Sequence, residues 1–338
     1  MKWAFKAGVV LAAATVLLLL VGEFIEPQSW PALVLVNYTP FPAYLLPVAL
    51  AAVASFWLGW AWRVVAVSAL LVVLTVVMGF AWGQADEGHG RVRFMTYNIK
   101  GYLAVRQQGG VAKLALEVNE HQPDILVMQD AVQLDFEGQG GETSVLKRLV
   151  GERHVYHFGQ YIVASRWPLS RCRVLGIPAA GEVHGAVACE VEAHGVRLNI
   201  VTAHYISPRD GLNAARKEGF EGIGQWQQNM LLRLQQTGML AEQLRQMSGP
   251  VILGGDLNAP ETSAVVQTLI NTGLRDAFAA AGRGYGYTHG HHLLRGLSFL
   301  RIDHILVSQG IGVVDAHVGG TEASQHRPVI ADLVVHRD

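Results

Sequence analysis

Charge and cysteine are both scarce in this 338-residue sequence, and each shortage excludes a class of protein. Only 16% of the residues are charged, and 26 basic side chains against 27 acidic ones leave a net charge of −1. That balance excludes a basic protein that coats nucleic acid and an acidic disordered tail. Two cysteines, Cys172 and Cys189, are too few for a disulfide framework or a cysteine-ligated zinc site. They either pair, if the domain faces an oxidising compartment, or stay buried as free thiols.

The few charges are unevenly distributed along the chain. Residues 1–82 contain only Lys2, Lys6, Glu23, Glu26 and Arg63, and all 14 histidines lie beyond residue 82. A mean hydropathy of +0.26 therefore averages an apolar N-terminal part and an ordinary soluble part. A chain of this length holds about two domains, which agrees with that division. The chemistry is to be sought in the second part.

Three apolar stretches in the first part predict transmembrane helices. A bilayer core of about 30 Å takes roughly 20 helical residues, and residues 44–62 and 64–82 carry no charge over 19 residues each. The first stretch is shorter, but Lys6 beside it can snorkel towards the headgroups. We therefore expect a bundle of three transmembrane helices, at about 4–22, 43–62 and 64–82. A cleavable signal peptide is the alternative for the first, although Val21-Gly22-Glu23 makes a poor cleavage site.

The basic residues predict how these helices are oriented. Lys2 and Lys6 favour a cytoplasmic N-terminus and Arg63 marks a second cytoplasmic turn, so three crossings put the rest of the chain outside the cytoplasm. Arg91 and Arg93, soon after the third stretch, argue for the opposite orientation. We predict a multi-pass protein of the inner cell membrane whose soluble domain is extracytoplasmic.

The chain divides on this basis into a membrane region at residues 1–83, a glycine-rich linker at 84–90 and a soluble domain at 91–338. The linker is short enough to hold the domain near the membrane surface. Helices are expected at 111–120 and 225–247, and short apolar runs predict strands at 92–99, 124–129, 161–165, 185–192, 196–203, 251–254, 302–307 and 329–335. Many strands, few helices and several hairpin-like pairs predict an α+β sandwich of two sheets rather than a doubly wound parallel sheet.

Polar residues recur at the ends of these apolar strands, where a rigid scaffold can aim them into a cleft. One Asn or Asp after a strand is usually a turn residue, and a lone histidine is usually structural. Six such segments in order are a much stronger signal, and we predict that they form one site. They are Thr96-Tyr97-Asn98-Ile99, Val127-Met128-Gln129-Asp130, Thr202-Ala203-His204, Gly254-Gly255-Asp256-Leu257-Asn258, Arg301-Ile302-Asp303-His304 and Ser324-Gln325-His326-Arg327-Pro328.

Through these segments the chain resembles the endonuclease/exonuclease/phosphatase superfamily, which includes deoxyribonuclease-I-like nucleases. Gly-Asp-Leu-Asn at 255–258 and Arg-Ile-Asp-His at 301–304 are the most specific pieces, and the resemblance covers about residues 91–336. It implies a four-layer α/β/β/α sandwich with the active site at one edge of the two sheets. It also implies hydrolysis of phosphoester bonds with Mg²⁺ or Mn²⁺ as the cofactor.

The resemblance makes Asp130 the principal metal ligand, with Asn98 beside it. Mg²⁺ prefers oxygen ligands and keeps several waters, so one or two carboxylates suffice. The chain departs from the family pattern at three positions. Asp130 stands where glutamate is usual, Gln325 where an aspartate usually precedes the final histidine, and Lys100 at a position that is acidic in some relatives. We therefore expect a single metal site, with Gln325 still able to hydrogen-bond to substrate.

The remaining roles implied by the resemblance are catalytic. Asp256 would align or deprotonate the attacking water, and Asn258 would hold a phosphate oxygen. His326 would contact the scissile phosphate, fixed in tautomer and charge by Asp303. His204 would be a second imidazole that donates to the phosphate or to the leaving oxygen.

Several neighbouring residues leave alternatives open. Arg209 is either a phosphate clamp over the cleft or part of a solvated loop. The histidines at 289, 291 and 292 are interpreted as loop residues rather than as a metal cluster. His304 is expected to be structural, and Trp226 to be a core or interface residue rather than a base-stacking platform.

These observations predict a membrane-anchored phosphoester hydrolase dependent on Mg²⁺ or Mn²⁺. Its substrate is either nucleic acid or a lipid headgroup, and the lipid bilayer is its expected partner; no protein partner can be inferred. The soluble part carries 23 basic and 25 acidic side chains, which disfavours electrostatic capture of nucleic acid. The alternative function, motivated by Asp130 and Gln325, is a catalytically silent membrane-tethered binding module of the same fold.

Overall fold

The computed structural model describes residues 2–24, 35–88, 91–132, 134, 145–177 and 185–335. The chain forms two compact units. One consists of residues 1–81, 208–231 and 262–264, and the other of residues 82–207, 232–261 and 265–338. Each is described below by itself.

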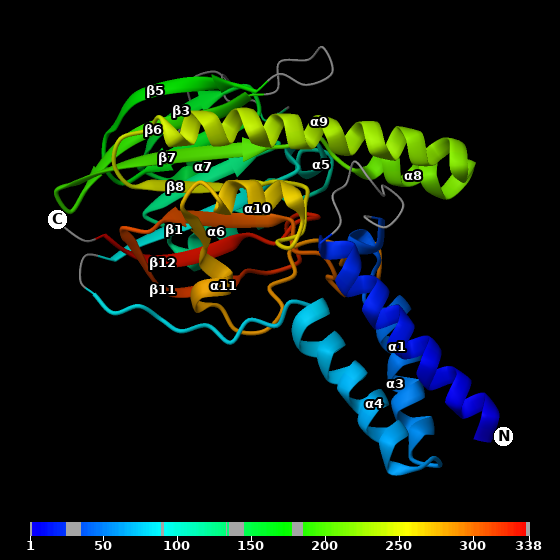
Figure 1. Ribbon diagram of the computed structural model, residues 1–338. Coiled ribbons are helices and arrows are strands. Elements are labelled where there is room, and N and C mark those ends of the chain that lie inside the picture. The colour runs from blue at the N-terminus through cyan, green and yellow to red at the C-terminus, as the bar shows by residue number, and fades with distance from the viewer. Residues whose placement is uncertain are drawn as a thin grey trace. The chain divides into compact units, whose positions relative to one another are not determined.

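The first unit contains the apolar N-terminal helices (Figure 1). They are α1 (Lys2–Phe24), η1 (Leu35–Tyr38), α3 (Pro42–Ser55), α4 (Trp60–Val72) and the π-helical η2 (Val73–Val77). By length and composition, the segments Lys2–Gly22 and Trp60–Val77 can cross a membrane. At 1.5 Å per residue, the 14 residues of α3 extend about 21 Å, less than the bilayer core. A bundle of three spanning helices is therefore not established, although two of its members are long enough.

The predicted span 43–62 is interrupted because its end belongs to another helix. Helix α3 ends at Ser55, whose hydroxyl donates to the carbonyl of Ala52. Gly59 then adopts an extended conformation, with φ −66° and ψ 162°, and α4 begins at Trp60. The same unit includes α8 (Arg209–Glu218) and the beginning of α9 (Phe220–Arg245), two helices that follow the apolar segments only far along the chain.

The second unit is a sandwich of two mixed sheets, each with six strands among the described residues. One sheet has the order β11-β12-β1-β2-β4-β3, with β11 (Ile311–Val318), β12 (Val329–Val335), β1 (Arg91–Asn98), β2 (Ile125–Gln129), β4 (Tyr161–Ser165) and β3 (His154–Phe158). The other has the order β5-β6-β7-β8-β10-β9, with β5 (Leu169–Gly176), β6 (Gly185–Ala193), β7 (Val196–His204), β8 (Val251–Asp256), β10 (Asp303–Ser308) and β9 (Leu274–Asp276). The predicted α+β sandwich is confirmed.

Helices cover the outer face of each sheet and make the sandwich four-layered. Helices α6 (Gly110–His121) and α7 (Val145–Val150) share an apolar core with β1, β2 and β4. The C-terminal part of α9 and α10 (Ala264–Ile270) share another with β6, β7 and β8. The short helices α5 (Gly101–Ala104) and α11 (Ala277–Ala281) complete the described elements of this unit.

The two sheets approach closely between β1 and β8. A Cβ atom at Gly254 would lie 2.6 Å from Cε1 of Phe94 and 2.9 Å from Cβ of Thr96, so this position tolerates only glycine. Because side chains alternate along a strand, Asn98 lies on the same face of β1 as these two residues. Asp256 likewise shares the face of Gly254 on β8. Both polar side chains therefore point into the space between the sheets.

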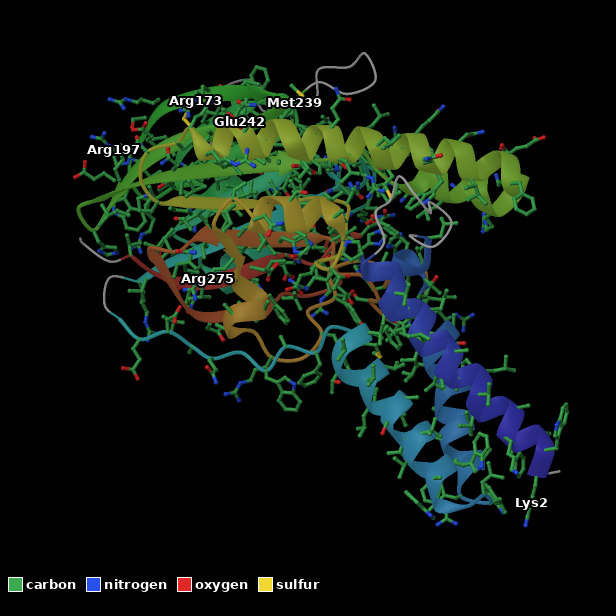
Figure 2. The ribbon with its side chains drawn as sticks, viewed as in Figure 1. Lys2, Arg173, Arg197, Met239, Glu242 and Arg275 are labelled. Carbon is green, nitrogen blue, oxygen red and sulfur yellow. A yellow bond between two sulfur atoms is a disulfide. The ribbon has the colours of Figure 1, made fainter. Side chains whose placement is uncertain are left out.

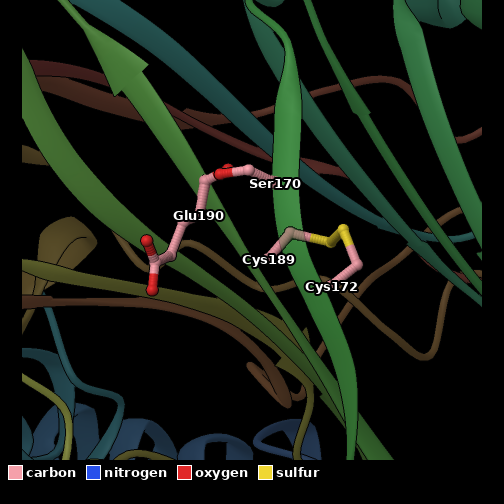
Figure 3. The surroundings of a disulfide bond; sticks show 4 residues. All are labelled: Ser170, Cys172, Cys189 and Glu190. Carbon is pink, nitrogen blue, oxygen red and sulfur yellow. A yellow bond between two sulfur atoms is a disulfide. The ribbon is translucent and has the colours of Figure 1, made fainter.

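The two cysteines form a disulfide between β5 and β6 (Figure 3). The strands pair Ser170 with Glu190 and Arg173 with Ala188, so two residues of β5 lie opposite Cys189 alone. This β-bulge brings Cys172 to Cys189. Of the two alternatives left open by the sequence, the structure has the paired cysteines.

The described part of the predicted linker is hydrogen-bonded to the second unit. The amide of Gln84 donates to the carbonyl of Ala280, and that of Asp86 donates to the carbonyl of Val313, both at 2.8 Å. The Asp86 carboxylate accepts the Val313 amide at 2.8 Å and pairs with Arg275, which Figure 2 labels. This segment is therefore fixed along the sandwich before β1 begins.

Candidate active site

Five strand ends bring the predicted site residues together. Asn98 and Gln129 are paired at the ends of the parallel strands β1 and β2. His204 is paired with Asp256 at the ends of the parallel strands β7 and β8. Because β10 runs antiparallel to β8, its first residue, Asp303, also lies opposite Asp256. Strand direction alone therefore gathers residues that are far apart in the sequence at one edge of the sandwich.

Asp256 lies at the centre of this group and is fully buried. Its Oδ2 accepts a hydrogen bond from Asn98 Nδ2 at 2.8 Å, across the two sheets. The same oxygen lies 3.5 Å from Nε2 of His204 and 3.7 Å from Nε2 of His326. Burial acts to raise the pKa of the Asp256 carboxyl, but the two imidazoles, Lys100 and the Asn98 hydrogen bond outweigh it and hold that pKa below its usual value. Asp256 is therefore a carboxylate at neutral pH.

His326 is held from behind by Asp303. Its Nδ1 donates to Asp303 Oδ2 at 2.9 Å and lies 3.2 Å from Oδ1. Burial acts to lower the pKa of His326, but the carboxylates of Asp303 and Asp256 outweigh it and raise that pKa above its usual value. The loop before it is fixed by Ser324, whose hydroxyl donates to the carbonyl of Asn98 at 2.8 Å. The pair is a carboxylate-supported imidazole with Nε2 facing Asp256.

His204 lies in a different electrostatic environment. Its Nδ1 is 2.5 Å from Oε1 of Gln160, and its amide donates to the hydroxyl of Tyr161 at 3.2 Å. Burial is the largest influence and lowers the pKa of His204, so the neutral imidazole is favoured. A neutral ring that donates from Nδ1 to the Gln160 carbonyl presents an unprotonated Nε2 towards Asp256. The pKa values of the two imidazoles that flank Asp256 are therefore shifted in opposite directions.

Asp130, the predicted metal ligand, is paired with Lys100. The ammonium of Lys100 lies 2.7 Å from Asp130 Oδ2, and both side chains are only 16% exposed. Burial acts to lower the pKa of Lys100, but the carboxylates of Asp130 and Asp256 outweigh it and raise that pKa. Gln129, beside Asp130, donates from Nε2 to Thr96 and to Thr202, which belong to different sheets. The ammonium shows that this end of the site favours a positive charge.

The donor atoms of the site suit a hard divalent cation. Asp256, Asp303 and His326 offer ligand atoms within 4.8 Å of one another, and all three residues are buried. Since Nδ1 of His326 already bonds to Asp303, the pair faces Asp256 through Nε2. Asp130 adds a further carboxylate that already holds a cation. Carboxylate oxygens are what Mg²⁺ and Mn²⁺ prefer, so the residues present fit such an ion.

Three predicted site residues have other partners or other places. Asn258, in a left-handed conformation with φ 50°, donates from Nδ2 to the carbonyl of Tyr205 at 2.9 Å, and its role towards phosphate stays a prediction. Gln325 lines a pocket of about 290 Å³ together with Lys100 and His292. Arg209 begins α8 in the other compact unit, so its role as a phosphate clamp stays a prediction as well.

The other histidines divide between structural roles and the site. His304 is structural, as expected, because its ring nitrogens bond Asp276 and the carbonyl of Ala259, each at 2.9 Å. His291 bonds the carbonyl of Ser324 at 2.9 Å. His289, interpreted from the sequence as an ordinary loop residue, instead packs its ring 4.8 Å from that of His326.

The environment of His289 keeps it uncharged. Its Nδ1 is buried and has no hydrogen-bond partner among the described residues. Burial, with a smaller contribution from His326 and His292, lowers the pKa of His289 to about 2. Nothing in the sequence around residue 289 predicts its contact with His326.

Trp226 is a core residue, as expected. It is fully buried against Tyr38, with ring centroids 5.3 Å apart.

Comparison with known proteins identifies what this arrangement is similar to. The sequence model of the Endonuclease/Exonuclease/phosphatase family matches residues 95–326. No curated protein matches the chain. Among solved structures, an endonuclease/exonuclease/phosphatase from Bacteroides vulgatus has a TM-score of 0.58 and 18% identity, covering 73% of this chain and 100% of that one.

Two further solved structures are similar over a comparable share of the chain. Truncated TDP2 from Caenorhabditis elegans has a TM-score of 0.54 and 21% identity, covering 72% of this chain and 98% of that one. A mannosyl-6-phosphatase from Bacteroides thetaiotaomicron has a TM-score of 0.54 and 17% identity, covering 72% of this chain and 99% of that one. At these identities the similarity shows the fold alone.

Proposed function

Because the chain belongs to the endonuclease/exonuclease/phosphatase family, we propose that it is a phosphoester hydrolase dependent on a divalent metal ion. The observation that carries this proposal is the position of Asp256, a buried carboxylate whose Oδ2 lies 3.5 Å from Nε2 of His204 and 3.7 Å from Nε2 of His326. Hydrolysis of a phosphoester needs a group that orients water and donors aimed at the phosphorus oxygens. We propose that Asp256 orients the water and that His326 is one such donor.

Each imidazole is suited to one part of this reaction. His326, whose raised pKa favours the imidazolium, donates from Nε2 to a non-bridging oxygen of the phosphate. His204, whose lowered pKa favours the neutral ring, takes a proton from the attacking water at Nε2 and then gives that proton to the leaving oxygen. Asp256 orients the attacking water between them. Paired groups with pKa values pushed apart divide acid and base roles in this way.

Asp130 and Asn98 would hold the metal ion, with Asp256 close to it. The ion supplies positive charge that offsets the charge developing on the phosphorus oxygens. Asn98 also fixes Asp256 by its 2.8 Å hydrogen bond, so one residue connects the metal side of the site to the water-orienting side. Asn258 is proposed to contact a phosphate oxygen, with Arg209 and Gln325 as further substrate contacts.

We propose a membrane-bound protein whose catalytic domain faces an oxidising compartment. Helix α1 and the segment Trp60–Val77 are long and apolar enough to anchor it. The Cys172–Cys189 disulfide supports an extracytoplasmic domain, because disulfides persist mainly outside the reducing cytosol. Two crossings would place the domain on the same side of the membrane as the N-terminus. If the N-terminus is cytoplasmic, an extracytoplasmic domain therefore requires a third crossing around α3.

The proposed substrate is a phosphoester in a lipid headgroup. Residues beyond 82 carry 23 basic and 25 acidic side chains, a balance that gives little attraction to a polyanion. A membrane anchor raises the local concentration of headgroups instead. Nucleic acid is the alternative, and a solved structure of TDP2 from Danio rerio is complexed with a single-stranded DNA product.

The test uses the full chain in detergent, with Mg²⁺ or Mn²⁺ and the diester bis-(p-nitrophenyl) phosphate. Wild-type protein should hydrolyse the diester, and Asp256→Ala should lower the rate by about 10³-fold or more. Equal rates in the two proteins would refute the assignment and favour the silent binding module. Labelled phospholipid vesicles, plasmid DNA and RNA, compared in one protocol, then identify the substrate class.

A further inference from the structure

Lys100 holds the carboxylate that the proposed metal ion needs. Its ammonium lies 2.7 Å from Asp130 Oδ2, and both side chains are largely buried. The same ammonium interacts with Asp256, so it lies in the field of two carboxylates of the site. A tethered positive charge is thus built into the end of the site where Asp130 offers its oxygens.

The backbone on both sides of this ion pair is held in an uncommon conformation. Lys100 has φ 44° and Asp130 has φ 57°, in the left-handed region that favours glycine. Hydrogen bonds fix the two strand ends to each other, from the amide of Ile99 to the carbonyl of Gln129 and from that of Gly101 to the carbonyl of Asp130. Such conformations cost free energy in residues that carry a side chain, so the surrounding hydrogen bonds hold these two residues in place.

A divalent ion and the Lys100 ammonium compete for Oδ2 of Asp130. Two cations within about 3 Å of one carboxylate oxygen repel strongly in a partly buried site. For the metal ion to take this oxygen, the ammonium must leave it. The displaced ammonium can move into the neighbouring pocket, which Lys100 lines together with His292 and Gln325.

We propose that Lys100 is a tethered cation that competes with the divalent ion for Asp130 and thereby sets the metal affinity of the site. This inference rests on the proposed function, because it takes Asp130 as a metal ligand. Ion binding then displaces the ammonium into the pocket beside the site. The protein binds its metal ion weakly until that exchange is complete, and removal of the lysine charge strengthens binding.

The experiment measures Mn²⁺ affinity of the full chain in detergent by calorimetry, which does not depend on turnover. Lys100→Gln should bind Mn²⁺ about 10- to 100-fold more tightly than the wild type, whereas Lys100→Arg, which keeps the charge, should stay close to it. Asp130→Asn should lose most of the affinity. Lys113→Gln is the matched control, because Lys113 is an exposed lysine on α6.

Lys100→Asn serves as a second variant, because asparagine tolerates the left-handed backbone at this position. Its affinity should rise as in Lys100→Gln. Unchanged or weaker Mn²⁺ binding in both variants overturns the competition, and if the wild type still hydrolyses the diester with metal, the proposed function stands. Absence of both Mn²⁺ binding and hydrolysis in every protein overturns the two proposals together. Lost hydrolysis at unchanged affinity would make Lys100 a substrate contact instead.

Discussion

Asp303 on β10 lies directly opposite Asp256 on β8, and the ring of His326 lies between the two carboxylates. Paired residues of antiparallel strands point to the same face, so the strand register alone brings these two negative charges together in a buried place. Two buried carboxylates repel each other unless a cation lies between them. The raised pKa of His326 is the consequence, because the imidazolium offsets both charges.

Replacing Asp303 with Asn should lower the pKa of His326 and weaken the hydrogen bond that orients its ring. The amide keeps the size of the side chain but removes one of the charges that raise the pKa of His326, so that pKa should fall. The rate of diester hydrolysis should drop by about 10²- to 10⁴-fold, the range for a displaced general acid or donor. An NMR titration of the His326 ring, together with the rate, checks both effects.

Asp315→Asn is the matched control for this prediction. Asp315 also pairs with a histidine, with 2.8 Å between its Oδ2 and His317 Nδ1, but that pair is exposed on β11. Its loss should leave the rate of hydrolysis and the pKa of His326 unchanged. If Asp303→Asn kept the wild-type pKa of His326, the carboxylate would not be what raises it.

His289 should make the folded protein less stable in acid. Its pKa is about 2 in the folded state, whereas an unfolded histidine has a pKa near 6.5. Below that unfolded pKa, the unfolded chain therefore binds a proton that the folded chain excludes. The free energy of unfolding then falls by about 1.4 kcal/mol for each unit by which the pH decreases. The free energy of unfolding of His289→Phe, measured with denaturant between pH 6 and 4, should therefore change less steeply with pH, by about that amount. Parallel curves for the two proteins would place His289 in contact with water.

The sequence predicted the central strands because burial on both faces leaves a continuous apolar run. Strands β4 and β12 begin and end where expected, at Tyr161–Ser165 and Val329–Val335. Strands β3 and β5 lie at sheet edges and are largely exposed, so their polar residues hide the pattern. Helix α8, with its many charged residues, gives no apolar run either.

The site could be predicted as far as it depends on strand ends, and no further. The segments around Asn98, His204, Asp256 and Asp303 meet because each ends or begins a strand at the same edge. Contacts made by loops could not be derived in this way, because loop conformation has no periodic signal. Gln160 beside His204 and His289 beside His326 are of this kind.

The Cys172–Cys189 disulfide should stabilise the fold without taking part in the chemistry. It closes a loop with a sequence separation of 17, for which the loss of unfolded-state entropy corresponds to about 3 kcal/mol. Replacing both cysteines with alanine should lower the free energy of unfolding by about that amount. Hydrolysis by the folded protein should be unchanged, because the disulfide joins β5 to β6 and none of the candidate site residues lies on either strand.

The redox state tests where the domain lies. In cells, wild-type protein should resist thiol labelling unless it is first reduced, as expected for a domain outside the cytoplasm. Free thiols in the folded protein from intact cells would contradict the proposed location. A loss of activity in the variant without cysteines, at a temperature where that variant is folded, would contradict a purely structural role of the disulfide.

Asp86 should fasten the segment that precedes the sandwich. Its carboxylate accepts the Val313 amide and pairs with Arg275, while its own amide donates to the Val313 carbonyl. In Asp86→Ala the Val313 amide loses its acceptor, at a cost of about 1–2 kcal/mol, to which the half-exposed ion pair adds little. Limited proteolysis of the purified protein should then cut within residues 82–90 faster than in the wild type. Glu87→Ala removes an exposed acidic side chain next to it and should leave the cleavage rate unchanged. If the two variants were cut equally fast, the local charge rather than the contacts of Asp86 would determine the rate of cleavage in this segment.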